Sequence, residues 1–477
     1  AVCMRRIDGE LVQCPFAAVC GHEKQREATP GVWITTFATL LYEKPDFLPE
    51  LDGIVADESF FMAAIGEPAT LDTSDLLRAK TELCSDDEEC FLLDMRMKLR
   101  AVVEDNGNGP LSRAVLDKHR AYANDALRAS TSEQRIVKPD ILRPNMSESG
   151  LDTAHRNHHA RNRLARDVGA IWDEIAMFLT FDHQRSGRLT VVGSAIALTP
   201  LRTFHPSWGA PVLALDATLP TPAILDAAVF GDEVAGIPST VSVKADIDIR
   251  WPDHVFVRQV VGDESFSKGQ FGIVDDGVPG IHRAPSSKSS AEDADDDKGK
   301  PRNLKNIARY IRMRAALVAP AKLGVVTYLG LRERLAGQVP PNVAWMHFGA
   351  TSGLNDFESV AGLIVIGRWW VPPEKVEAMA GVFAGRPIAP IGEYYRRRTG
   401  GIRMTDGSIV PAVVEYHPDP FAEAVRCQIT VGELIQAVGR LRAPRRGQSC
   451  FVDILSKVVL PLTVDEVVDW DSIKPGA

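Results

Sequence analysis

The chain has 477 residues, 45% of them hydrophobic and 25% charged, a composition typical of a globular protein of roughly two to four domains. It contains no run of about 18 apolar residues and opens on no charged-then-apolar leader, which argues against a transmembrane helix and against secretion. The net charge of -9 argues against a general polyanion binder, so nucleic-acid binding would have to rest on local basic stretches. Such stretches lie at residues 156–166, 396–403 and 440–446.

The cysteine count bears on the redox compartment of the protein, and the first residue bears on whether the chain is a fragment or a processed product. Seven cysteines are an odd number for a disulfide framework and few for this length, which favours a reducing, cytoplasmic location. Ala1 stands where an initiator Met is expected, which favours a fragment or a processed product.

Two apolar segments open the first half of the chain. Residues 32–41 are apolar and β-branched, which predicts a buried strand leading into a helix. Residues 53–57 predict a second buried strand, which ends in the acids Asp57 and Glu58.

A helical pattern follows. Apolar residues recur at helical spacing between about residues 68 and 181, most clearly at 92–103 and 165–179. Strand patterns return at 189–197 and 211–215. The segment from 285 to 301 is rich in Ser, Asp and Lys and is typical of a solvated insertion.

The second half of the chain alternates helix and strand. Helices are predicted at 307–318, 331–335, 374–383 and 421–441, and strands at 323–328, 344–348, 360–366, 409–416 and 450–455. Alternation of this kind predicts a parallel sheet covered by helices, and therefore an α/β fold.

The adjacent acids Asp57 and Glu58 form the first candidate site. At the carboxyl end of a strand in an open α/β sheet they lie where ligands bind. One acid can hold the Mg²⁺ that bridges nucleotide phosphates, and the next can polarise the attacking water. A strand end followed by a helix cap explains the same residues equally well.

Two further loops follow predicted strands. Asp216-Ala217-Thr218-Leu219 offers hydroxyl and carboxylate groups at the end of strand 211–215, although a Thr in a strand-to-helix turn is common. Residues 349–357 (GATSGLNDF) contain two glycines that let the backbone approach a ligand, and any turn can share this composition.

The end of helix 421–441 carries Gln436, Gly439, Arg440 and Arg442. Arginines suit a helix C-terminus electrostatically, which is a purely structural explanation. They can also reach across a cleft and stabilise charge on a transferring phosphoryl group.

Taken in order, these segments resemble motifs II, III, V and VI of DExH-type superfamily 2 helicases, most closely the DinG/XPD-like branch. Asp57 to Phe60 resemble its Asp-Glu-Ala-His, and Asp216 to Leu219 its Ser-Ala-Thr-Leu. Ser352 to Asn355 are similar to its Arg-Gly-x-Asp, and residues 325–328 (VVTY) to motif IV. A narrower resemblance to plasmid- and phage-type helicases rests on residues 20–25 and on residues 417–420 (HPDP).

This resemblance implies two RecA-like α/β lobes, the first one truncated, with a helical insertion between motifs II and III. The implied boundaries are 1–67 for the partial first lobe, 68–185 for the insertion, 186–235 for the remainder of that lobe and 236–477 for the second lobe.

The resemblance also assigns roles. ATP and Mg²⁺ are the implied cofactors, with Asp57 coordinating the metal and Glu58 orienting water. Arg440 and Arg442 act on the phosphates and Gln436 senses the nucleotide. Implied nucleotide contacts are Gly439, Gly353 and Asn355, and implied contacts for coupling or nucleic acid are Asp216, Thr218, Thr351, Ser352 and Thr327.

The N-terminal cysteines predict a metal site. Cys3, Cys14 and Cys20, with His22 close by, can make a Zn²⁺ site, and a further upstream cysteine would permit an iron–sulfur cluster as in the resembling branch. Buried free thiols are the alternative, because the spacing matches neither a C-x-x-C pair nor the helicase pattern.

Several departures from the family pattern bear on activity. No G-x-x-x-x-G-K-[ST] occurs, so the lysine that binds the β- and γ-phosphates is absent. Phe60 replaces the motif II histidine, and Ala443 occupies the position of the second motif VI arginine, so that either Arg442 or Arg445 replaces it or one arginine is lost.

We therefore expect an ATP-dependent translocase or helicase on single-stranded DNA, with RNA not excluded, that does not hydrolyse ATP alone. Implied partners are replication or mobile-element proteins, and no membrane. The alternative is a non-catalytic nucleic-acid-binding remnant or regulatory module of a mobile genetic element.

Overall fold

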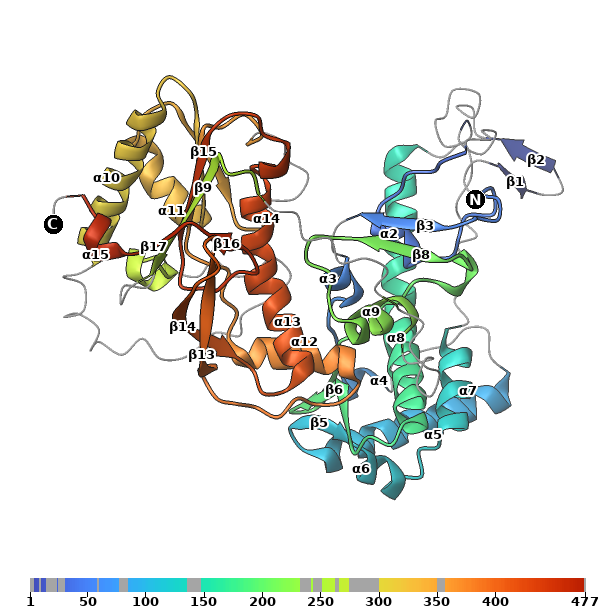
Figure 1. Cartoon of the computed structure of the whole chain (residues 1–477). Coiled ribbons are helices and arrows are strands. Elements are labelled where there is room, and N and C mark those ends of the chain that lie inside the picture. Colours follow the sequence, from blue (N-terminus) through green and yellow to red (C-terminus); the bar gives the residue numbers. More distant parts are fainter. Residues whose placement is uncertain are drawn as a thin grey trace. The chain divides into compact units, whose positions relative to one another are not determined.

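The computed structural model places the chain in two compact units, which are described separately here (Figure 1). Unit 1 comprises residues 1–215, 221–241 and 377–388, and unit 2 comprises residues 216–220, 242–376 and 389–477. The residues whose structure is described are 4–7, 10–13, 24, 31–57, 60–76, 85–134, 147–231, 242, 251–261, 266–273, 300–349 and 357–475.

Unit 2 is built on a six-stranded sheet in which every pairing is parallel. In spatial order its strands are β11 (Val343–His347), β10 (Leu323–Thr327), β12 (Gly362–Ile366), β15 (Cys450–Leu455), β9 (Val255–Val261) and β17 (Glu466–Asp469). Strands β10 and β12 are buried along their whole length, as continuous apolar runs predict for central parallel strands.

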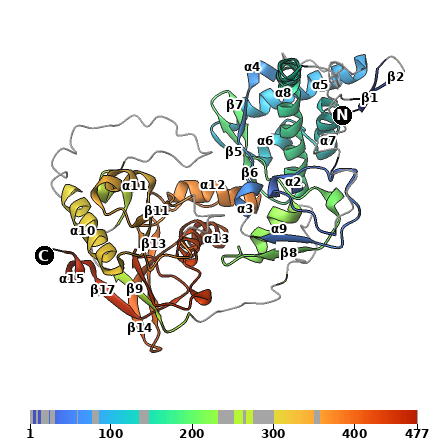
Figure 2. The same ribbon diagram turned by 90° about the horizontal axis from the view of Figure 1, so that it is seen from above.

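Helices cover both faces of this sheet. Helices α10 (Lys300–Val318) and α11 (Leu329–Leu335) connect strands that progress in one direction along the sheet, and α13 (Pro420–Cys427) and α14 (Glu433–Gly439) lie on the connection that runs the other way. Because parallel crossovers are right-handed, the two sets lie on opposite faces, an arrangement that can be followed in Figures 1 and 2. The prediction of a parallel sheet covered by helices is confirmed for this unit.

Unit 2 also carries a small second sheet, of order β14-β13-β16. Its strands are β13 (Arg396–Met404), β14 (Ile409–Tyr416) and β16 (Thr463–Val464). The remaining helices in or entering this unit are α12 (Pro373–Ala384) and α15 (Trp470–Ile473).

A buried ion pair ties α10 to the centre of the main sheet. Arg314 donates to both carboxylate oxygens of Asp453 on β15 at 2.6 and 2.9 Å, and the Tyr310 hydroxyl donates to the same carboxylate at 2.8 Å. Asp453 is fully buried, and burial raises its pKa against the lowering effect of Arg314 and Tyr310.

Unit 1 contains a helical body packed on an antiparallel sheet. The strands lie in the order β4 (Ala69–Asp72), β7 (Ala195–Leu198), β6 (Arg185–Val192) and β5 (Gly109–Ser112). The main helices are α5 (Asp86–Asn106), α7 (Ala123–Glu133) and α8 (Glu148–Thr180), and the shorter ones are α4 (Thr73–Leu76) and α6 (Arg113–Lys118). A buried ion pair at 2.7 Å joins Arg96 of α5 to Glu133 of α7.

This body agrees with the helices predicted at 92–103 and 165–179 and differs in its strands. Residues 189–197, predicted as one strand, form a hairpin of β6 and β7 because Gly193 takes a positive φ of 61° at the turn. Strands β4 and β5 lie inside the stretch predicted to be helical. The body is therefore mixed α/β rather than purely helical.

The rest of unit 1 holds a parallel pair of strands, β3 (Ile54–Asp57) and β8 (Val212–Leu215), with the short helices α2 (Phe37–Leu40), α3 (Phe61–Ala64) and α9 (Pro222–Phe230). An antiparallel pair, β1 (Met4–Ile7) and β2 (Glu10–Gln13), lies nearer the N-terminus.

Two predictions for this region were wrong. Residues 32–36 form no strand, because within the described ranges no neighbouring strand pairs with them, and Val32 and Ile34 are exposed. Strand β3 forms as predicted but is not buried, since Val55 is 65% exposed.

Candidate functional site

The acid of the first motif lies at a strand end that it shares with the second motif. Asp57 ends β3, is exposed, and pairs in parallel register with Leu215, the last residue of β8. The carboxyl ends of β3 and β8 therefore meet at one edge, and Asp216 begins directly after it. Glu58 lies outside the described residues.

Phe60, at the position that resembles the histidine of motif II, has a packing role. It is 5% exposed, and its ring lies 5.4 Å from that of Phe37 and 5.2 Å from that of Phe204. An aromatic cluster therefore occupies the position at which the resembling family has a polar contact.

Asp216 shapes the turn that presents Thr218. Its carboxylate accepts from the Thr218 backbone N–H at 2.8 Å and from the Thr218 hydroxyl at 3.1 Å, the geometry of an Asx turn. Thr218 is thereby held in a fixed orientation after β8.

Thr218 contacts the helix that carries Gln436 and Arg440. The Gln428 side-chain amide donates to the Thr218 hydroxyl at 3.2 Å. Gln428 begins a π-helical turn, Gln428–Gly432, which joins α13 to α14. A single π turn inside an α-helix re-aims the side chains around it, and such turns are frequent at functional sites.

The same π turn is fixed from a second direction. Thr430 donates its hydroxyl proton to the Trp369 carbonyl oxygen at 2.9 Å, and Trp369 follows β12. The turn is thus held both by the segment after β8 and by the segment after β12.

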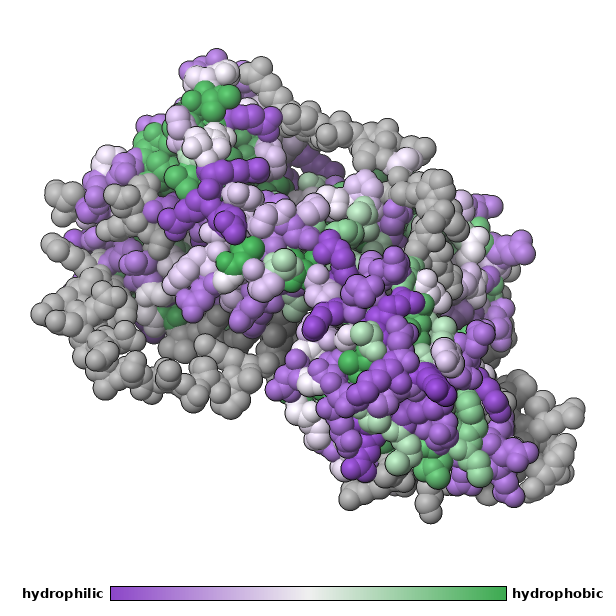
Figure 3. All heavy atoms as spheres, turned by 90° about the horizontal axis from the view of Figure 1, so that it is seen from below, coloured by the Kyte–Doolittle hydropathy of each residue, from purple (hydrophilic) through white to green (hydrophobic). Residues whose placement is uncertain are grey.

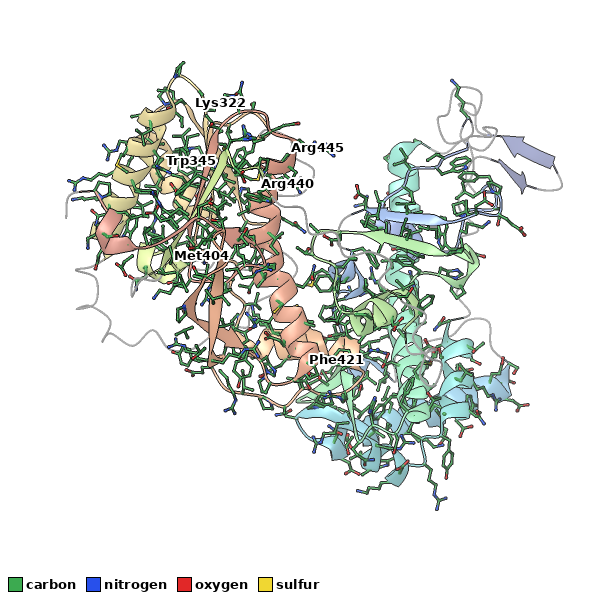
Figure 4. All side chains as sticks on the ribbon, in the orientation of Figure 1. Lys322, Trp345, Met404, Phe421, Arg440 and Arg445 are labelled. Carbon is green, nitrogen blue, oxygen red and sulfur yellow. The ribbon has the colours of Figure 1, made fainter. Side chains whose placement is uncertain are left out.

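Arginines gather at the far end of α14. The helix ends at Gly439, and Arg440 occupies the C-cap position, where a cation interacts favourably with the negative end of the helix dipole. Figure 4 shows Arg440 and Arg445 at this end of the helix and Phe421 at the start of α13. Arg440 is half-buried and Arg445 is exposed.

The neighbouring residues explain the departure from the family pattern. Ala443 is 1% exposed and packs in the core, so an arginine side chain would not fit there without rearrangement. Arg442 takes a positive φ of 50°, and its guanidinium lies 3.9 Å from the Glu358 carboxylate. Arg445 is exposed and Arg442 is half-buried, so Arg445 is the more accessible of the two arginines predicted as alternatives.

The switch point of the sheet in unit 2 is a second place where ligands are expected. Strand β10 has its successor β11 on one side and β12 on the other, so the carboxyl ends of β10 and β12 mark the reversal of strand order. Thr327 ends β10 but is fully buried, and its hydroxyl donates to the Ile366 carbonyl at 3.1 Å. Its observed role is thus inside the sheet, linking β10 to β12.

Close packing at this switch point requires glycine. Gly367 follows β12 with φ 89°, and a Cβ there would lie 2.4 Å from the Tyr328 hydroxyl oxygen. Gly349 has φ 81°, and a Cβ there would lie 2.4 Å from the Trp369 ring. Residues 350–356, including Thr351, Ser352, Gly353 and Asn355, lie outside the described residues.

Sequence reasoning did not single out Tyr328 and Arg368 as site residues. The Tyr328 hydroxyl lies 2.9 Å from the Arg368 backbone N–H, which donates to it, and Arg368 forms an ion pair of 2.8 Å with Glu415. The position of Arg368, in the loop directly after the carboxyl end of β12, was a usable signal, because ligands bind outside such strand ends in open α/β sheets.

The His-Pro-Asp-Pro segment is a helix cap. Asp419 caps α13 by accepting from the backbone of Phe421 at 2.9 Å, and Pro420 occupies the first turn. Glu423 accepts from the His417 backbone N–H at 2.8 Å and pairs with Arg426 at 2.7 Å. Burial opposes ionisation of Glu423, but Arg426 and the His417 amide outweigh it, and the pKa of this carboxyl is lowered.

Two further titratable groups on these elements have shifted pKa values. Burial raises the pKa of the Cys427 thiol to about 11, which leaves it protonated. Burial and the nearby Arg332 lower the pKa of His347 at the end of β11, which leaves this imidazole neutral.

The predicted metal site lies beyond the described ranges. Cys3, Cys14, Cys20 and His22 all fall outside them. Within those ranges no group of three His, Cys, Asp or Glu side chains is placed to hold a metal ion.

Comparison with known proteins gives no family. No protein-family model matches the chain, and no curated protein matches it. Among the helices in the described ranges, none combines the length and apolar character needed to cross a membrane.

Proposed function

We propose that this chain is the greater part of an ATP-driven motor that moves along single-stranded nucleic acid, with two RecA-like lobes of superfamily 2 helicase type. The observation that carries the proposal is the hydrogen bond between Thr218 and Gln428. It joins the segment that follows β8 to the helix that bears Gln436, Gly439 and Arg440. A link of this kind is what a motor needs to make phosphate chemistry sensitive to strand position.

Each candidate residue then has a chemical task. Asp57 would coordinate Mg²⁺ and Glu58 would orient the attacking water. Arg440, with Arg445 or Arg442, would neutralise charge on the transferring phosphoryl group, and Gln436 would sense the nucleotide. The half-buried position of Arg440 supports this task, because a partly desolvated cation acts more strongly than one in water.

The phosphate-binding loop would come from polypeptide outside the given sequence. Parallel strands are ordinarily buried on both faces, yet Val55 of β3 and Leu213 and Leu215 of β8 are 65%, 48% and 48% exposed. A strand-turn-helix carrying G-x-x-x-x-G-K-[ST] would both extend this sheet and supply the missing lysine.

ATP turnover with and without single-stranded DNA tests the proposal. We expect the chain as given to be inactive, and a version extended upstream at its gene to hydrolyse ATP faster when the DNA is present. If neither protein hydrolyses ATP under either condition, the motor function is wrong.

Two variants of the extended protein test the residue roles. Glu58→Gln is expected to bind ATP without hydrolysing it, and Arg440→Ala to lower turnover by about 10³-fold, as loss of an arginine finger does. Arg309→Ala, an exposed arginine on α10, is the matched control and should retain full turnover. Near-normal turnover of Arg440→Ala would show that Arg440 does not neutralise charge on the transferring phosphoryl group.

A further inference from the structure

The β13–β14 ribbon carries exposed arginines on β13. Arg396, Arg397 and Arg403 are exposed, and within the described part of the chain they make no ion pair or hydrogen bond. In a chain whose net charge is -9, surface arginines usually have acids near them. Three arginines on one strand without such interactions among the described residues make this part of the surface locally positive.

Register assigns two of these arginines to one face of the ribbon. Because side chains alternate along a strand, Arg397, Thr399 and Arg403 of β13 share a face with their cross-strand partners on β14. Those partners are, in the same order, Glu415, Val413 and Ile409. Arg397 and Arg403 are six residues apart, so they lie roughly 20 Å apart along the strand.

The acids nearest to this face are already engaged. Glu415 is paired with Arg368 at 2.8 Å, which leaves Arg397 opposite an occupied carboxylate. Asp406, in the turn at the tip, accepts from the Ser408 backbone and hydroxyl at 2.8 and 2.6 Å. These hydrogen bonds lower the pKa of Asp406, with the Ser408 hydroxyl as the largest cause, so it stays ionised but fixed in its own turn.

The same face exposes side chains that suit the apolar parts of a polymer. Ile409 is 66% exposed and Val413 is 64% exposed. Tyr394 lies outside the paired register, two residues before β13; it is 75% exposed and has an aromatic ring for an unpaired base. Figure 3, which views the molecule from below, shows hydrophilic side chains over most of the coloured surface, with hydrophobic patches between them.

The foot of the ribbon is anchored firmly. Tyr395 is buried, and its hydroxyl donates to the Val371 carbonyl at 2.7 Å. The Arg426 guanidinium of α13 lies 5.7 Å from the centre of the Tyr395 ring. The ribbon is therefore fixed to α13, which continues into the π turn and α14. A force exerted on the ribbon by a bound polymer would be transmitted to α13.

We infer that the face of the β13–β14 ribbon bearing Arg397, Thr399 and Arg403 binds the phosphate backbone of single-stranded nucleic acid. This assignment rests on the proposed function for its choice of ligand. It adds a binding surface on the ribbon that precedes α13, and the exposed Tyr394 just before the ribbon would take an unpaired base.

Equilibrium binding of a fluorescent 20-nucleotide oligo(dT) to the chain as given, without nucleotide and over a range of salt, tests the inference. The variant is Arg397→Ala/Arg403→Ala. The matched control is Lys305→Ala/Arg309→Ala on α10, which removes the same charge from exposed side chains that make no interaction within the described structure. Thermal unfolding of both variants should match that of the wild type, because none of the four side chains has an ion pair or hydrogen bond among the described residues.

We expect the ribbon variant to bind roughly tenfold more weakly at 0.1 M salt, and its slope of log affinity against log salt to be shallower by about 1.4, which is two single-strand phosphate contacts. The control should keep the wild-type slope. Tyr394→Ala should weaken binding without changing the slope, and Tyr394→Phe should restore it.

The outcomes separate the two proposals. If the wild type binds and the ribbon variant binds equally well with the same slope, the ribbon assignment is overturned and the proposed function stands. If the wild type binds no oligonucleotide even at the lowest salt, the nucleic-acid function itself fails. If the ribbon variant loses binding only to vesicles of phosphatidylserine and phosphatidylcholine, the ribbon is a membrane surface and the inference is wrong.

Discussion

The parallel strands of the two units have similar sequences and opposite surroundings. Residues 53–57 (GIVAD) and 362–366 (GLIVI) both predict buried strands, yet β12 is buried throughout and β3 has one buried residue, Ala56. In unit 2 each central strand has a strand on both sides and helices on both faces. In unit 1, within the described ranges, β3 pairs with β8 alone. An apolar run therefore predicts a strand, but the strands and helices that pack against it decide whether that strand is buried.

The largest expected difference concerns carboxylates in the two kinds of strand. Asp453→Ala in β15 would leave Arg314, 12% exposed, as a buried charge without its partner, which typically costs about 3–5 kcal/mol of unfolding free energy. Asp57→Ala in β3 removes an exposed carboxylate and should change the unfolding free energy by no more than about 0.5 kcal/mol. Urea unfolding followed by tryptophan fluorescence measures both.

Asp453→Asn separates charge from shape in the same experiment. It keeps the volume of the side chain while it removes the charge that faces Arg314, so it should fall between the wild type and Asp453→Ala. Equal costs for Asp57→Ala and Asp453→Ala would mean that β3 is as enclosed as β15, which would contradict the comparison.

A chemically identical substitution sharpens the comparison. Val365→Ala in β12 removes two buried methyl groups and should cost about 2 kcal/mol. Val55→Ala in β3 removes the same groups from a side chain that is 65% exposed, and should cost less than about 1 kcal/mol. The ratio of the two costs, measured by urea unfolding, reports how completely β3 is covered.

The same pair of variants can report completion of the sheet in unit 1. In a version of the protein extended upstream, the cost of Val55→Ala should rise toward that of Val365→Ala, because additional strands and helices would cover the side chain. An unchanged ratio would show that the extension does not pack on β3.

The comparison also explains which parts of the fold the sequence could predict. The apolar runs of β10, β12 and β15 follow the simple rule for central strands, and the predictions there are confirmed. Strand β9 (VFVRQVV) was missed because Gln259 interrupts the run; its amide is buried at 1% exposure and donates to the Ser456 and Val458 carbonyls. Partners that lie about 200 residues away cannot be read from a local pattern.

Strand β13 was missed for a different reason. Its sequence, RRRTGGIRM, is polar and contains two glycines, which ordinarily weaken a strand. Here the glycines leave room for side chains of β14, since a Cβ at Gly400 would lie 2.4 Å from Val414 and one at Gly401 would lie 2.2 Å from Ile409. The charged face of β13 is exposed to solvent, so the strand lacks the apolar residues from which a buried strand is predicted.

The candidate site was predictable in its order and not in its contacts. Asp57 at the end of β3 and the Asp-Ala-Thr turn after β8 follow from strand ends, and these two strands end in register with each other. The π turn and the bond from Gln428 to Thr218 depend on packing between segments about 210 residues apart. Local helix propensity gives no sign of an added residue in a turn.

The smallest predicted effect concerns pH and the cap of α13. The pKa of Glu423 is lowered in the folded protein, so its contribution to stability is fully present above the unfolded value of about 4.5 and is lost as the pH falls through the folded value. At pH 7 Glu423→Gln should lower the unfolding free energy by about 1 kcal/mol, through weaker bonds to Arg426 and the His417 amide. As the pH falls through the lowered folded value, the wild-type carboxyl protonates and resembles the amide, so the two urea-unfolding curves should converge. A difference that stays constant from pH 7 to pH 3 would mean that Glu423 supports the cap by shape alone, and that the charge seen between Glu423 and Arg426 contributes nothing to the helix on which Gln436 and Arg440 depend.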